Sequence, residues 1–385
     1  MTKIHWAIGI IVCIILGILL AFYIGSLDTP QSVHSILENP SPSPTTLPLE
    51  KYKIENLKST ATNANAIKIT KELEKTDQFT AYQFTFKASG GKMTGQLTLP
   101  AGEIDLTKQL PTILMIRGFV PPSSCETGIG TKNGAAAFAT AGFITVAPDF
   151  LSCGESDPEP KESWEARFIK PVQVIELLSS IEKYGVPLDQ ETAPFVKIGP
   201  VGIWGHSNGG QIALSVLQAL EEPIPTTLWA PVTAPFPYSI LFFSDEADDE
   251  GKELRKWLSI FERDYDVFDF TVTQHLERLR GPIQLHHGSA DEAAPKAWSD
   301  EFVGKIKIEN SRRAADTPFP EPIATASASI NQESGSAEVI FQPMTNLEEI
   351  DLTYFEYPGA DHNMTPYWDE VVQRDIEFFI KNLPN

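Results

Sequence analysis

Basic residues are scarce in this chain, and their scarcity excludes one class of function. The 385 residues include 30 Lys and Arg against 51 Asp and Glu, which gives a net charge of −21. A protein that binds nucleic acid needs a basic surface that releases counterions from phosphates, and the sequence has no basic stripe of that kind. We therefore expect no nucleic-acid partner.

Cofactor motifs are absent as well. No metal-ligand spacing, P-loop or dinucleotide-binding fingerprint occurs in the sequence. We therefore expect no cofactor and no metal site. The chain also lacks an internal repeat, and its length suits one large α/β domain with appendages.

One long apolar run stands at the amino terminus. Residues 4–24 contain no charged side chain, and at a rise of about 1.5 Å per residue a helix of this length can cross a hydrocarbon core of ~30 Å. A cleavable signal peptide is the alternative, but no A-x-A site follows the run. Lys3 lies on its amino side, so the positive-inside rule places the large domain outside the cytoplasm. We predict a single-pass membrane anchor in residues 1–26.

The segment that follows the anchor is rich in Pro, Ser and Thr. Residues 27–50 carry no apolar periodicity, and this composition favours an extended linker without a packed core. We assign residues 51–385 to one folded domain.

Strand-like and helical patterns alternate through that domain, which is typical of a mostly parallel sheet flanked by helices. A hairpin over residues 82–99 is expected to open the sheet. Pro171 should kink or break the helical segment 162–184. Further strand-like runs occupy 112–116, 143–147, 201–204, 226–230, 282–287 and 352–357, and further helical patterns occupy 135–141, 212–220 and 371–380.

Two segments interrupt this alternation. Residues 231–274 carry many aromatic side chains, which a disordered linker would not, and we interpret them as a small helical cap. Residues 311–345 are rich in Ala, Ser, Thr and Pro, and we interpret them as a low-complexity insertion before the last strand.

The most informative stretch is 202–210, which reads Gly-Ile-Trp-Gly-His-Ser-Asn-Gly-Gly between a strand and a helix. A G-x-S-x-G motif in that context is typical of a nucleophile elbow, whose tight turn exposes the serine at the carboxyl end of the sheet. Gly205 and Gly209 leave room for such a turn. Ser207 is therefore the candidate nucleophile, and a purely structural turn is the alternative.

The candidate base is His362, in the loop between the last strand and the last helix, from which it can reach over the strand ends. A surface-loop histidine is the alternative for this residue. The side chain of His206 is expected to point away from the serine hydroxyl. We interpret His286 and His287 as structural or pocket-lining residues rather than as bases.

The acid that orients His362 should lie between the serine and the histidine in the chain. Asp291 follows the penultimate strand-like run and is the candidate, with Glu292 as its rival. Asp361 is too close in sequence to orient its neighbour comfortably. The backbone N–H groups of Asn208 and Phe119 are the candidate oxyanion-hole donors. Asn208 directly follows the candidate nucleophile, and Phe119 lies in the loop after the strand-like run 112–116.

The motifs 202–210, 287–291 and 359–362 together resemble the catalytic domain of the prolyl oligopeptidase family of serine peptidases, which has the α/β-hydrolase fold. The resemblance runs from about residue 80 to the end, without the insertion. It implies the same nucleophile, acid and base at Ser207, Asp291 and His362, and a peptidase acting on short peptides. The large amino-terminal propeller of well-known members has no room here, so a carboxylesterase or dienelactone-type hydrolase is the alternative. A non-catalytic surface binding module is a more remote one.

Two further features bear on this interpretation. Cys125 and Cys153 follow consecutive strands at the same end of the sheet, and we hypothesise a disulfide formed in an oxidising compartment; two unrelated thiols are the alternative. The acidic run 244–250 could anchor the free amine of a peptide, although a solvated acidic turn explains it more simply.

Overall fold

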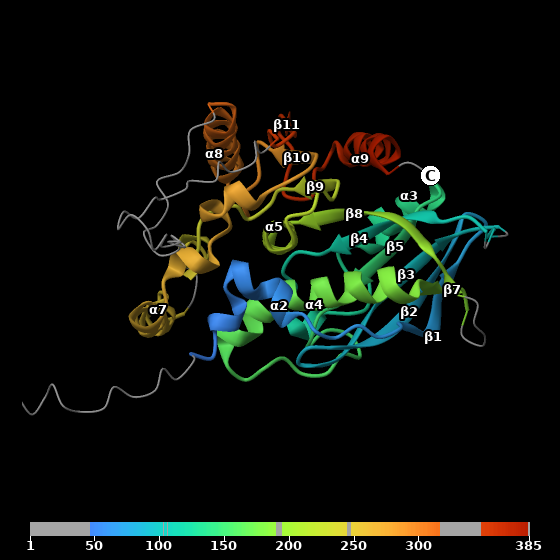
Figure 1. Cartoon of the computed structure of the whole chain (residues 1–385), viewed down its shortest axis with the longest axis horizontal. Helices are drawn as coiled ribbons and strands as arrows, with labels where there is room; N and C mark the ends of the chain where they lie inside the picture. The colour runs from blue at the N-terminus through green and yellow to red at the C-terminus, as the bar shows by residue number, and fades with distance from the viewer. Residues whose placement is uncertain are drawn as a thin grey trace, which may run out of the picture. The chain divides into compact units, whose positions relative to one another are not determined.

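One mixed sheet organises the protein (Figure 1). The computed structural model describes residues 47–385 except 103, 106, 190–194, 245–247, 316–347 and 384–385. Within this part, nine strands follow the order β1-β2-β3-β5-β4-β8-β9-β10-β11. The strands are β1 (Lys68–Lys75), β2 (Phe79–Ala88), β3 (Gly91–Pro100), β4 (Leu110–Ile116), β5 (Ile144–Pro148), β8 (Ile198–His206), β9 (Thr226–Trp229), β10 (Ile283–Gly288) and β11 (Leu352–Tyr357). A separate antiparallel pair joins β6 (Val186–Pro187) to β7 (Phe195–Val196).

Strand direction divides the large sheet into two parts. The pairs β1–β2, β2–β3 and β3–β5 are antiparallel, whereas every pair from β5 to β11 is parallel. The expected hairpin is the β2–β3 pair, and the expected mostly parallel α/β architecture is confirmed. Because the carboxyl ends of parallel strands meet at one edge, the loops after β4, β8, β10 and β11 gather there.

Helices cover both faces of the parallel part (Figure 1). Successive residues of β8 point to opposite faces: Ile203 packs with α4 (Ser163–Tyr184) and α5 (Asn208–Leu220), and Trp204 packs with α3 (Lys132–Thr140) and α9 (Trp368–Asn382). Burial on both faces explains the continuous apolar runs that made these strands recognisable in the sequence.

The structure settles one of the two outcomes expected for Pro171, a break in the helix. The residue lies inside α4, which continues as one helix from Ser163 to Tyr184 rather than breaking. Proline removes the N–H that would bond to the carbonyl of Arg167 four residues earlier. Twelve of the residues of α4 are buried, so packing of this helix against the sheet and α5 compensates for the one missing bond.

Several elements were not anticipated, among them the short pair β6–β7, strand β1 and helix α8. Strand β1 is an edge strand with alternating charges, and only Ile69 is buried in it, so it carries no apolar signal. Helix α8 (Lys296–Ala314) extends four residues into the segment assigned to the insertion. Residues 316–345 of that insertion lie outside the described residues.

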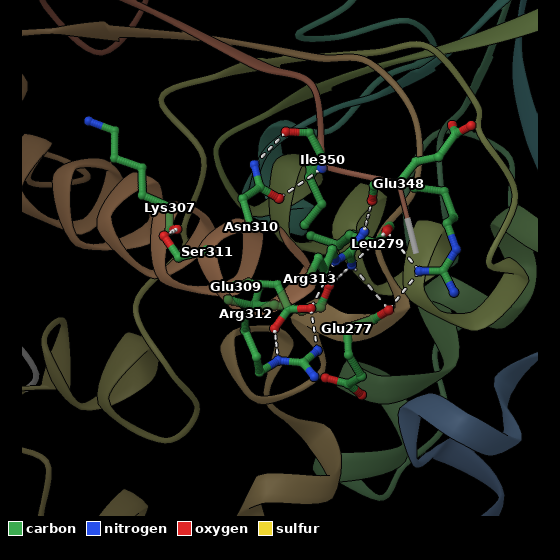
Figure 2. Close-up of polar contacts among 12 residues, drawn as sticks. Glu277, Leu279, Lys307, Glu309, Asn310, Ser311, Arg312, Arg313, Glu348 and Ile350 are labelled. Carbon is green, nitrogen blue, oxygen red and sulfur yellow. Dashed lines mark hydrogen bonds and ion pairs between the residues drawn. The ribbon is translucent and has the colours of Figure 1, made fainter. Parts of the chain in front are cut away.

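Figure 2 shows why α8 continues past residue 310. Arg313 is buried, pairs with Glu309 at 2.9 Å and donates to the carbonyl of Glu348 at 2.7 Å. Asn310 exchanges two hydrogen bonds with the backbone of Ile350, at 2.8 and 2.9 Å. These contacts hold together the two chain segments that border residues 316–347.

The amino-terminal predictions fall largely beyond the described part. The expected anchor, residues 1–26, lies outside it, as does the expected linker up to residue 46. The described residues from 48 onward form one compact unit, in which Leu49 is buried and donates its N–H to the hydroxyl of Tyr265 at 3.1 Å. None of the helices in the described residues has the length and apolar character needed to span a bilayer.

The expected cap is helical. Between β9 and β10 lie α6 (Tyr238–Leu241), α7 (Lys252–Asp264) and short 3₁₀ turns at Val267–Phe270, Val272–Gln274 and Leu276–Arg278. Aromatic side chains hold it to α4: the ring of Phe168 lies 4.7 Å from that of Phe270 and 5.4 Å from that of Phe236.

Candidate active site

Ser207 stands at a strained turn between β8 and α5. Its φ of 56° and ψ of −124° are unfavourable for a residue with a side chain, and such strain persists only where the surroundings impose it. A Cβ on Gly209 would lie 2.0 Å from the carbonyl oxygen of Ile116, and one on Gly118 would lie 2.9 Å from the Cβ of Ser207. Glycine is therefore required where α5 and the loop after β4 approach the serine.

Asp291 and His362 are in contact although they come from the loops after β10 and β11. The Nδ1 atom of His362 lies 2.8 Å from Oδ2 of Asp291. The other carboxylate oxygen accepts the backbone N–H groups of Ala293 and Ala294, each at 2.9 Å. Burial opposes the charge on Asp291, but hydrogen bonds from His287, His362 and the Ala294 amide outweigh it and lower the carboxyl pKa.

This contact determines which nitrogen of His362 is available for chemistry. A carboxylate accepts, so Nδ1 must carry a proton and Nε2 of the neutral ring keeps a lone pair. His362 and Ser207 line the same cavity. Among the described residues, however, no hydrogen bond joins the Ser207 hydroxyl to the His362 ring. Catalytic hydrogen bonds are often long or poorly aligned in the absence of substrate. The missing bond therefore does not exclude His362 as the candidate base.

His206 has a role that the sequence did not reveal. Its Nε2 atom lies 2.9 Å from the backbone oxygen of His362, and the two rings are 4.7 Å apart. Because a carbonyl can only accept, Nε2 of His206 is the donor. Burial, together with the nearby His362, lowers the pKa of His206 to about 4, so the ring is neutral at neutral pH.

His287 supports the candidate acid, Asp291, from the opposite side. It is fully buried, and its Nε2 lies 2.8 Å from the carbonyl of Ala294 and 3.1 Å from Oδ2 of Asp291. Its Nδ1 lies 2.7 Å from the hydroxyl of Ser299, so the ring is locked as a donor toward the acid. His287 is structural, as expected from the sequence, and it also positions Asp291.

Asp361, which neighbours the candidate base, accepts the N–H groups of Asn363 and Thr365 within its own turn. It therefore shapes the loop and does not compete with Asp291 as a partner of His362. Glu292 is exposed.

The candidate oxyanion donors lie beside the serine. Phe119 and Asn208 both line the cavity that contains Ser207, and Asn208 is the first residue of α5. Neither backbone N–H donates to another described residue. The first N–H groups of a helix lack intrahelical acceptors, so the amide of Asn208 is available to an anion. The loop that presents Phe119 is held by Arg117, which donates to the carbonyls of Gly118 and Asp149.

A disulfide joins Cys125 to Cys153 close to this loop. A guanidinium nitrogen of Arg117 lies 3.3 Å from the sulfur of Cys125, and both cysteines border a small cavity that Phe119 and Asn208 also line. The bridge thus ties together the loops after β4 and β5 next to the candidate oxyanion site.

The cavity above Ser207 has a volume of about 750 Å³. Its floor is α5, one wall is α4, and the cap supplies mostly apolar side chains opposite them. The cap residues are Val232, Phe236, Ser239, Ile240, Phe243 and Phe270. In the described part of the chain no group of His, Cys, Asp and Glu side chains is arranged to hold a metal ion.

The acidic run 244–250 does not reach this cavity through its described members. Asp249 accepts the N–H groups of Gly251 and Glu253 at 2.9 and 2.8 Å, which shapes the turn before α7. Glu250 pairs with Lys252 on the surface at 3.2 Å. Residues 245–247 lie outside the described part.

Comparison with known proteins shows the fold. No protein-family profile and no curated protein sequence matches the chain. Acetyl xylan esterase 1 from a Thermoanaerobacterium species is similar in structure, with 14% identity, a TM-score of 0.52, and coverage of 86% of this chain and 94% of that one. An acylaminoacyl peptidase from Pyrococcus horikoshii has 13% identity and a TM-score of 0.51 over 79% of this chain and 42% of its own.

A puromycin-hydrolyzing peptidase from Mycobacterium tuberculosis has 13% identity and a TM-score of 0.49 over 79% of this chain and 37% of its own. The chain thus spans about two fifths of the length of these two peptidases and nearly all of the esterase. The order of the nine strands and the serine at a strand–helix elbow agree with the likeness to the acetyl xylan esterase and to the acylaminoacyl peptidase. The chain therefore has the α/β-hydrolase fold.

Proposed function

We propose that this protein is a serine hydrolase in which Ser207 is the nucleophile, His362 the base and Asp291 the orienting acid. The observation that carries the proposal is the 2.8 Å contact between His362 and Asp291 beside a serine at a strained elbow. Ser207 and His362 line one cavity, and the buried Asp291 contacts the side of the His362 ring that carries Nδ1. This arrangement matches that of a serine activated by a base and an orienting acid.

In the proposed reaction, Nε2 of His362 takes the proton of the Ser207 hydroxyl as its oxygen attacks an acyl carbonyl carbon. The amides of Asn208 and Phe119 hold the resulting oxyanion. His362 then gives the proton to the leaving group as the carbon–leaving-group bond breaks. His362 then takes a proton from water, which attacks the carbonyl carbon of the acyl-enzyme. The bond to Ser207 breaks, the acid product is released, and the serine regains its proton.

Short peptides are the first candidate substrates, on the strength of the motif at 202–210. Esters are the second, and one observation favours them. Among the described residues that line the cavity, only Glu159 carries a side-chain carboxylate, and it is paired with Lys170 at 3.0 Å. No free carboxylate in that lining is therefore available to bind the amino terminus of a peptide. Acetyl xylan esterase 1, of which this chain covers 94%, is named as an esterase.

A fluorophosphonate probe tests the proposal, because it modifies only an activated serine. We expect labelling of the wild type at Ser207 and none in Ser207→Ala. Ser215→Ala is the matched control, since this serine also lines the cavity from α5 but bonds the carbonyl of Gln211 at 3.1 Å. Ser207→Ala should lower kcat by roughly 10⁶ with an unchanged unfolding curve. Absence of label on the folded wild type would refute the proposal. Parallel rates on aminoacyl amides, unblocked dipeptides and short acyl esters would then separate the two substrate classes.

We also propose that residues 1–26 anchor the enzyme to a membrane with its catalytic domain outside the cytoplasm. The uncharged run 4–24 and the Cys125–Cys153 bridge support this, since disulfides persist in oxidising compartments. Protease added to intact cells should digest the domain, and deletion of residues 1–26 should release it from the membrane fraction. Protection of the domain in intact cells would contradict the orientation.

A further inference from the structure

Arg167 projects from α4 into the wall of the cavity that contains Ser207 and His362. One of its terminal nitrogens donates to the side-chain oxygen of Gln211 at 3.1 Å, and the guanidinium carbon lies 5.9 Å from the ring centre of Phe236. Within the described residues it has no carboxylate partner. A neutral amide and an aromatic face orient this cation without neutralising it.

An unneutralised guanidinium in this position is costly. Arg167 is partly shielded from water, and desolvation lowers its pKa to about 10, so it remains charged at neutral pH. Lys170, one turn further along α4, lines the same cavity but is already paired with Glu159. The side chains of the lining thus contribute two cations and one carboxylate. The net charge there is positive in a protein whose overall charge is −21.

The helix register places this charge close to the candidate nucleophile. Gln211, which orients Arg167, lies three residues after Asn208 in α5, or about 4.5 Å along the helix axis. Apolar side chains such as Ile212, Phe236 and Ile240 line the same cavity. A ligand that fills it meets an apolar surface, a cation on one wall and the serine at the elbow.

We propose that Arg167 is a specificity-determining residue that binds a free carboxylate of the substrate, while the rest of the substrate occupies the apolar part of the cavity. This inference rests on the proposed hydrolase activity at Ser207. Guanidinium suits the role because its planar fork can donate two parallel hydrogen bonds to a carboxylate. The carboxylate belongs either to the acyl part, as in a dicarboxylic acid monoester, or to the leaving group, as at the carboxyl terminus of a peptide.

Matched pairs of substrates distinguish these two sources. For the acyl side we would compare p-nitrophenyl hydrogen adipate with its methyl ester; for the leaving group, an N-acetyl dipeptide with its carboxamide. In the wild type we expect kcat/KM at least about tenfold higher for the anionic member of one pair. Arg167→Gln should bring that ratio close to one. Lys183→Gln is the matched control, because it removes the same charge from an exposed position of the same helix and should keep the wild-type ratio.

A wild type that prefers the neutral member of both pairs would overturn the assignment, and so would an unchanged ratio in folded Arg167→Gln. The hydrolase proposal has a separate test, because it would be refuted by absence of fluorophosphonate labelling on the folded wild type. Binding provides a second readout that needs no turnover: calorimetry with Ser207→Ala should detect p-nitrophenyl hydrogen adipate or the acetylated dipeptide acid. The added Arg167→Gln change should weaken that affinity by at least about tenfold. Equal affinity in the two backgrounds would also overturn the assignment.

Discussion

His206 holds the backbone of His362: its Nε2 atom lies 2.9 Å from the carbonyl oxygen of the candidate base. The residue next to the candidate nucleophile therefore supports the loop that carries the candidate base. Burial of this imidazole makes its protonation unfavourable in the folded protein, and this links the stability of the site to pH.

The first prediction concerns stability below neutral pH. The pKa of His206 is about 4 in the folded protein against an ordinary value of 6.5, so the unfolded state binds more protons between these values. The contribution of His206 is present above about pH 6.5 and is lost as the pH falls toward 4. The free energy of unfolding should fall by up to about 3 kcal/mol through this residue. Urea titrations at several pH values would measure it.

His206→Gln is the control, because an amide can still donate to the His362 carbonyl but does not titrate. In this variant the decrease between pH 6.5 and 4 should be smaller by the same amount. Equal pH dependence in the two proteins would show that His206 does not titrate as described.

The second prediction concerns the acid. Asp291→Asn should lower kcat by roughly 10³–10⁴, because an amide can donate to Nδ1 of His362 and favour the wrong tautomer. The matched control is Asp361→Asn, whose side-chain oxygen can still accept the two backbone N–H groups of its turn. We expect this control to keep most of the activity in an ester assay. A similar loss in both variants would indicate that loop shape, and not the orientation of His362, is responsible.

The third prediction compares two helical glycines. Gly209→Ala would place a methyl group 2.0 Å from a backbone oxygen, which cannot move away without displacing the β4 loop. We expect loss of fluorophosphonate labelling and a destabilisation of several kcal/mol, on the order of 3 or more. Gly304→Ala in α8 meets no atom within 4 Å and should stabilise the protein by up to about 1 kcal/mol. Thermal unfolding of both variants measures the contrast, and equal melting temperatures would contradict it.

The fourth prediction concerns the disulfide. The bridge closes a loop between residues 28 apart, so its removal should cost about 3–4 kcal/mol by the chain-entropy estimate. Replacing both cysteines by serine should also lower the rate, because Arg117 contacts Cys125 and holds the backbone next to Phe119. Melting temperature and kcat would be compared with the wild type. A lower melting temperature with unchanged kcat would separate the bridge from the oxyanion site.

Much of the architecture was predictable because it is encoded locally. The elbow is specified by residues within one short stretch, and its glycines are required by contacts within that turn and the adjoining loop. The parallel strands are recognisable because burial on both faces demands continuous apolar runs. Edge strand β1 lacks that requirement, and α8 is amphipathic too weakly to stand out beside a low-complexity segment.

Some interactions at the site could not be predicted, because they join side chains from two different elements. The sequence of neither element alone determines how the two pack together. The contact of Arg167 with Gln211 depends on how α4 lies across α5, and a lone arginine in a helix gives no sign of facing a cavity. The same holds for His206 beneath His362 and for His287 beside Asp291. Pro171 is the converse case, since a local rule predicted a kink or a break and tertiary packing prevented the break.

The sequence by itself determined the α/β fold and the order of the candidate nucleophile, acid and base along the chain. Periodicity, turn chemistry and the rule that parallel strands end at one edge are properties that a linear pattern carries. Only the tertiary structure decided which nitrogen of His362 is available, what supports its loop, and that a cation without a carboxylate partner lines the cavity. Those features depend on distances between side chains far apart in the chain, and close packing of the core sets such distances.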